Sequence, residues 1–81
     1  MLTNVKKYRL EKGLTQAELS NASQISLGTI RKYEQGLANI EDSGLFALLM
    51  IAKTLNVRPY DLIESQAMRL LWMQAEGSND N

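Results

Sequence analysis

The chain has 81 residues, of which 44% are hydrophobic, a length and composition that suit one small globular domain. It contains neither cysteine nor histidine, which excludes disulfides, thiolate zinc sites and the commonest general base. The formal net charge is zero. We find no apolar run of about 18 residues and no signal peptide, so we expect a cytoplasmic protein that does not enter a membrane. We expect no cofactor and no bound metal.

The zero net charge conceals an uneven distribution. Residues 1–36 carry six cations and three anions, a balance of +3, whereas residues 37–81 carry three cations and six anions, a balance of −3. The first part is therefore suited to face phosphates, with random scatter of the charges as the alternative.

All expected elements are helices, because β-branched residues never alternate with polar residues over the length of a strand. The first helix covers about residues 4–12 and ends at Gly13, which caps it. The second helix opens at Thr15. The side chain of Thr15 can cap the amide of Glu18, and that of Glu18 can reach back to the amide of Thr15.

The second and third helices each have an apolar side. In the second helix, Leu19 and Ala22 are expected to face inward. The third helix covers residues 26–35, with Ser26 as its N-cap and Ile30 and Tyr33 on its inner side.

The fourth helix is expected over residues 41–55 and forms the centre of the core. Glu41 and Asp42 form a charge pair at its N-terminus, a role that suits them better than a cation site. Its apolar stripe has helical spacing and consists of Leu45, Phe46, Leu48, Leu49, Ile51, Ala52 and Leu55.

The fifth helix begins after Arg58, with Pro59 in its first turn, where the missing amide costs nothing. Asn56 ends the preceding helix in the left-handed conformation. We expect the fifth helix to continue to about Glu76, and the polar residues 77–81 to form a disordered tail.

The segment Leu14–Gly36 resembles the helix-turn-helix of the XRE family, which includes the phage lambda repressor and Cro. The resemblance continues to Ile63. Its matching pieces are Glu11–Gln16, Glu18–Leu19, Ile25, Thr29–Ile30, Tyr33–Gly36, Ala52–Leu55 and Asp61–Ile63. The resemblance implies a lambda-repressor-like bundle of five helices, which forms a DNA-binding domain over residues 1–64. Residues 65–76 then form a C-terminal helical extension.

A helix fits the major groove of DNA, where each base pair presents a distinct set of donors and acceptors. The resemblance implies that the third helix reads bases from Leu27, Gly28 and Lys32, with Arg31 close by. The expected phosphate contacts are Gln16, Ser26, Thr29, Gln35 and Lys12.

The sequence departs from the family at two places. Leu27 and Gly28 lack the polar side chains that relatives usually carry there, which argues against high sequence specificity. Gln24 occupies the corner where glycine is usual, so we expect strain at a positive φ or a differently built corner. The resemblance also implies a structural ion pair between Arg9 and Glu34, and Tyr33 is expected to pack half-buried instead of stacking on a base.

The C-terminal extension carries an apolar face made of Met68, Leu71, Trp72 and Ala75, with Leu70 and Met73 on a second face. Such a helix either covers the core or provides an interface. A homodimer would place two recognition helices about 34 Å apart, one turn of DNA.

These observations predict a sequence-specific DNA-binding transcription regulator, most simply a repressor, that acts on double-stranded DNA and is not an enzyme. The alternative is an antitoxin-like or interaction module, in which the C-terminal helix grips a protein such as a toxin or an antirepressor. No triad, metal cluster or glycine-rich phosphate loop supports catalysis.

Overall fold

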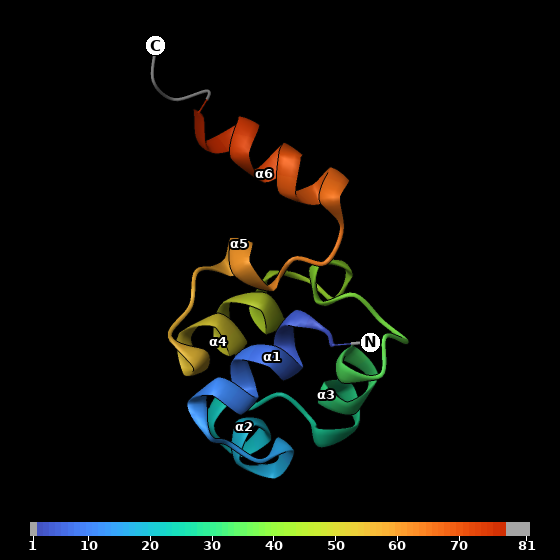
Figure 1. Cartoon of the computed structure of the whole chain (residues 1–81), viewed down its shortest axis with the longest axis vertical. Helices are drawn as coiled ribbons and strands as arrows, with labels where there is room; N and C mark the ends of the chain where they lie inside the picture. The colour runs from blue at the N-terminus through green and yellow to red at the C-terminus, as the bar shows by residue number, and fades with distance from the viewer. Residues whose placement is uncertain (1, 78–81) are drawn as a thin grey trace.

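The computed structural model describes residues 2–77 and contains only helices in that range, which confirms the predicted fold class. α6 lies at one end of the molecule, beyond α5, and α2 and α3 lie toward the other end (Figure 1). The elements in chain order are α1 (Asn4–Lys12), α2 (Gln16–Ser23), α3 (Leu27–Glu34), the 3-10 turn η1 (Ile40–Asp42), α4 (Leu45–Leu55), α5 (Pro59–Leu62) and α6 (Gln66–Gly77).

The predicted caps of the first helices are confirmed. Gly13 ends α1 in the left-handed conformation, with φ 77°. Thr15 and Glu18 form the capping box: the Glu18 amide donates to Thr15 Oγ1 at 3.0 Å, and the Thr15 amide donates to Glu18 Oε1 at 2.8 Å. Ser26 caps α3 by accepting from the Thr29 amide. These local bonds satisfy amides that have no partner within the helix and so fix where α2 and α3 begin.

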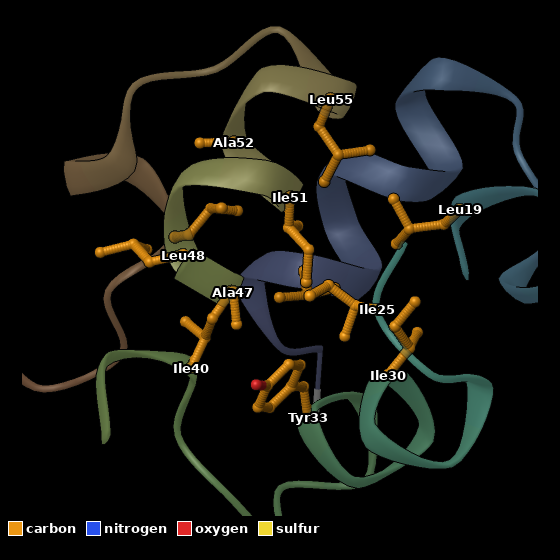
Figure 2. Packing of buried hydrophobic residues seen from close by; sticks show 12 residues of the cluster. Leu19, Ile25, Ile30, Tyr33, Ile40, Ala47, Leu48, Ile51, Ala52 and Leu55 are labelled. Carbon is orange, nitrogen blue, oxygen red and sulfur yellow. The ribbon is translucent and has the colours of Figure 1, made fainter. Parts of the chain in front are cut away.

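α4 is the centre of the core, as predicted, and it packs against α1, α2, α5 and η1 (Figure 2). Ile51 is fully buried between side chains of the other helices, among them Leu19 and Ile30. The buried residues of α4 are Ala47, Leu48, Ile51, Ala52 and Leu55.

The prediction that Leu45, Phe46 and Leu49 belong to this core is wrong. Their exposed fractions are 62%, 63% and 44%. α4 has apolar residues around most of its circumference, but the other helices pack on one side only, so the opposite side stays in solvent. Ala22 of α2 is likewise exposed, against the prediction that it faces inward.

α4 also begins later than predicted, at Leu45. The 3-10 turn η1 precedes it, and Gly44, with φ 98°, redirects the chain between the two. Glu41 therefore does not lie at the N-terminus of α4. Its carboxylate instead accepts the amides of Glu64 at 3.1 Å and Ser65 at 2.8 Å.

The predicted fifth helix is two helices. α5 ends at Leu62, and Ile63 adopts an extended conformation with ψ 126°. α6 then starts at Gln66 and includes Gly77, which we expected in the tail. The remaining tail residues, 78–81, lie outside the described part of the chain. Asn56 is left-handed, with φ 57°, as predicted.

Candidate nucleic-acid interface

The corner between α2 and α3 is held by two serines. Ser20 Oγ donates to the Ile25 carbonyl at 2.6 Å, and the buried Ser23 Oγ accepts from the Ile25 amide at 3.3 Å. Gln24, between Ser23 and Ile25, adopts φ 62°, which is the first of the two alternatives that we stated for this corner. Neither serine is among the residues that we predicted to shape the corner, although two serines shortly before a non-glycine corner residue are a usable signal.

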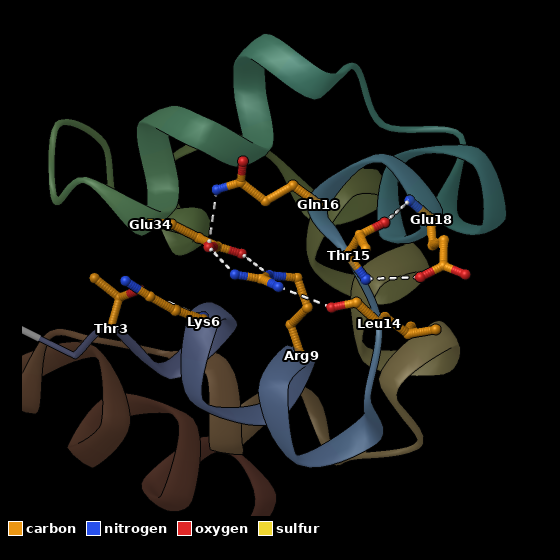
Figure 3. A network of polar contacts seen from close by, with 8 residues as sticks. All are labelled: Thr3, Lys6, Arg9, Leu14, Thr15, Gln16, Glu18 and Glu34. Atoms are coloured by element: carbon orange, nitrogen blue, oxygen red, sulfur yellow. Dashed lines mark hydrogen bonds and ion pairs between the residues drawn. The ribbon is translucent and has the colours of Figure 1, made fainter.

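A buried ion pair joins α1 to α3, as predicted (Figure 3). Arg9 Nε donates to Glu34 Oε2 at 2.7 Å and Nη2 donates to Oε1 at 2.9 Å, which is a bidentate pair. Arg9 Nη1 also donates to the Leu14 carbonyl at 2.8 Å, and Gln16 Nε2 donates to Glu34 Oε1 at 3.1 Å. This network ties α3 to the start of α2.

The charges of this pair are stabilised by each other. The hydrogen bond to Glu34 raises the pKa of Arg9 above its ordinary value. Burial alone would raise the pKa of the Glu34 carboxyl, but the hydrogen bonds from Arg9 and Gln16 outweigh burial and hold that pKa below its ordinary value. Both groups therefore stay ionised at neutral pH.

The outer face of α3 carries the predicted base-reading residues. Gly28, Arg31 and Lys32 are exposed, and Leu27 is half-buried. The one carboxylate of α3, that of Glu34, is turned inward to Arg9. The outer face is therefore cationic, even though the whole chain is neutral.

The predicted phosphate contacts lie at the ends of α1, α2 and α3. Ser26 and Thr29 lie in the first turn of α3, where their hydroxyls hydrogen-bond each other at 2.7 Å. Gln35 and Lys12 are exposed, at the C-terminal ends of α3 and α1. Gln16 is half-buried at the start of α2, and its side-chain amide donates a hydrogen bond to Glu34.

Tyr33 points into the core and is 3% exposed, so it packs more deeply than the half-buried position that we predicted (Figure 2). Its hydroxyl is buried and has no hydrogen-bond partner among residues 2–77. Met68, Leu71, Trp72 and Ala75 of α6 take no part in the helix-turn-helix, and Trp72 packs partly buried against the core.

A helix-turn-helix family model matches residues 5–62 of the chain. The chain belongs to the XRE helix-turn-helix family. This region is therefore a DNA-binding domain of the kind found in regulators. No curated protein and no solved structure matches the chain. Across residues 2–77, every helix is too short or too polar to cross a membrane.

Proposed function

We propose that this protein is a sequence-specific transcription regulator, a repressor, that acts in the cytoplasm by placing α3 in the major groove of DNA. The cationic outer face of α3 is the observation that carries the proposal. Arg31 and Lys32 are both exposed there, while Glu34 is withdrawn into the ion pair with Arg9. A positively charged, rigidly held helix is what groove binding requires.

Each residue of this face has a proposed role. Lys32, with Arg31 beside it, donates to guanine O6 and N7, and Leu27 contacts a thymine methyl group. At Gly28 a Cβ atom would meet nothing within 4 Å inside the protein, so packing does not demand glycine there. The absence of a side chain at Gly28 instead lets the helix backbone approach the bases.

The phosphate contacts hold α3 in register. They come from the ends of α1, α2 and α3 and do not distinguish sequences. The proposed contributors are Gln16, Ser26, Thr29, Gln35 and Lys12.

We also propose that the protein binds DNA as a homodimer, with α6 in the interface through Met68, Leu71, Trp72 and Ala75. None of the residues of α6 is buried, so this helix has accessible surface that a partner can contact. It lies away from α2 and α3 and therefore leaves the groove-facing side open (Figure 1). Two copies would read half-sites about 34 Å apart.

The same exposure of α6 favours a second candidate function. In an antitoxin-like protein, α6 would grip a different protein, such as a toxin or an antirepressor. Leu70, Leu71 and Met73 are 56%, 57% and 55% exposed, which suits either kind of partner.

Truncation of Lys32 tests the DNA-binding proposal. Lys32→Ala is expected to weaken binding to a selected duplex by about 1–3 kcal/mol and to relax the preference at one base pair. Folding stability is expected to stay unchanged because Lys32 is exposed. Arg58→Ala is the control, since it removes an exposed cation at the N-cap of α5. Equal affinities of wild type and Lys32→Ala for every duplex would remove Lys32 from the interface.

A further inference from the structure

The exposed side of α4 is an apolar ridge. Leu45, Phe46 and Leu49 lie within one helical turn of one another, with exposed fractions of 62%, 63% and 44%. Large apolar side chains that cluster in solvent usually mark an interaction site. The core does not account for this ridge, because α4 buries its opposite side.

The ridge continues onto α6. Leu45 lines a crevice of about 130 Å³ together with Met68 and Trp72 of α6. Leu71 follows Met68 by about one turn and is 57% exposed. We call this combined surface the α4–α6 face, and it consists of Leu45, Phe46, Leu49, Met68 and Leu71.

The five residues of the α4–α6 face are uncharged, although Glu41 also lines the crevice between Leu45 and Met68. Charges of opposite sign lie at the two ends of α4. Asp42 stands just before α4, Lys53 stands in its last turn, and both are exposed. Depletion of charge at the centre and polar groups at the edge are typical of protein interfaces.

The order of residues along α4 is complementary to itself in the antiparallel direction. A twofold axis at the level of Ala47 and Leu48 would place Phe46 opposite the partner's Leu49. The same antiparallel arrangement would bring Asp42, which precedes α4, toward the partner's Lys53 in the last turn of α4. An isologous interface needs this kind of self-complementarity, because the same surface is used by both copies.

From this pattern we propose that a second copy of this chain docks on the α4–α6 face, with the two α4 helices antiparallel. The inference rests on the homodimer of the proposed function and moves the centre of its interface from α6 to α4. Trp72 of α6 is already partly covered by the core. A standard interface buries roughly 800 Å² per partner, which favours a surface that spans α4 as well as α6. Phe46 is 63% exposed and adds a large aromatic side chain to this surface.

Sedimentation equilibrium of the full chain at tens of micromolar tests the location of the interface. Wild type is expected to be dimeric, and Phe46→Ser is expected to weaken dimerisation about tenfold or more. Leu10→Ser is the matched control, because Leu10 is 53% exposed but lies on α1. Thermal melts are expected to show both variants folded, since both side chains are largely exposed.

The charge pair tests the antiparallel arrangement. Asp42→Lys and Lys53→Asp are each expected to weaken the dimer several-fold by placing like charges together, and the double variant is expected to restore it. Two weakened single variants without restoration in the double variant would overturn the antiparallel arrangement.

Two further outcomes separate this inference from the proposed function. A dimer that survives Phe46→Ser but is lost in Leu71→Ser would overturn the role of α4 and leave a dimer through α6. A wild-type monomer at tens of micromolar would overturn the homodimer altogether. The DNA-binding proposal would then still be tested separately by the Lys32→Ala variant.

Discussion

The two ends of the molecule are held in different ways. At the helix-turn-helix end, Arg9 and Glu34 form a buried bidentate pair that joins α1 to α3, and Gln16 extends the network to α2. At the other end, no residue of α6 is buried. Contacts just before α6 help to hold it, since Glu41 accepts the amides of Glu64 and Ser65. Trp72 of α6 also packs against the core.

Arg69 completes the attachment of α6. Its Nε donates to the Ile63 carbonyl at 2.8 Å, and its guanidinium lies 4.8 Å from the centre of the Tyr60 ring. The two ends of the molecule therefore suit two different kinds of recognition, of DNA and of a protein partner. A helix that reads base edges must be held rigidly, whereas a peripheral helix can offer its surface to a partner.

The largest expected effect comes from breaking the buried pair. Glu34→Ala leaves the Arg9 guanidinium buried without its counter-charge, so we expect the free energy of unfolding to fall by about 3–5 kcal/mol. Urea denaturation measures this change. Glu11→Ala, at an exposed position of α1, is the control and is expected to change little. A loss below about 1 kcal/mol would show that the ion pair does not hold the helix-turn-helix end together.

An intermediate effect is expected where α6 is attached. Glu41→Ala removes the acceptor of two partly buried amides, which we expect to cost about 1–2 kcal/mol. The amides of α6 should then exchange hydrogen faster, while those of α2 and α3 keep their protection. Equal acceleration at both ends would contradict the difference that we describe between them.

The smallest expected effect is a gain at the corner of the helix-turn-helix. Gln24→Gly removes the cost of a side chain at φ 62°, so we expect up to about 1 kcal/mol of added stability. Ala22→Gly, on the exposed side of α2, is the matched control and is expected to destabilise by about 1 kcal/mol. If Gln24→Gly destabilised as much as the control, the corner would carry no strain.

The helix-turn-helix end could be predicted from the sequence because its determinants are local or belong to a family pattern. The Thr15 and Glu18 capping box needs only three residues of spacing, and the Arg9–Glu34 pair followed from the resemblance. The positive φ at Gln24 followed from the missing glycine. Which residues of the helix-turn-helix end contact DNA stays a prediction.

The other end could be predicted only in part: helical spacing indicated a helix near residues 65–76, but the determinants of its attachment lie far apart in the sequence. The apolar residues of α4 cover most of its circumference, so helical spacing alone does not show which side is buried. The positions of the other helices decide this, and they leave Phe46 in solvent. The break after α5 has a similar cause. Asn4 Nδ2 donates to the Ile63 carbonyl at 3.1 Å, and Glu41 accepts the next two amides, so partners from distant segments hold the chain extended.

The measurement that tests the central claim most directly is fluorescence anisotropy across a salt series. Two DNA duplexes are compared. The first is selected by this protein from a random library, and the second has the same bases in scrambled order. We predict tight binding to the selected duplex only, with a steep loss of affinity as salt rises, because several phosphate contacts accompany base reading. Weak and equal binding to both duplexes would contradict the claim that α3 reads DNA and would favour a protein partner as the target of this fold.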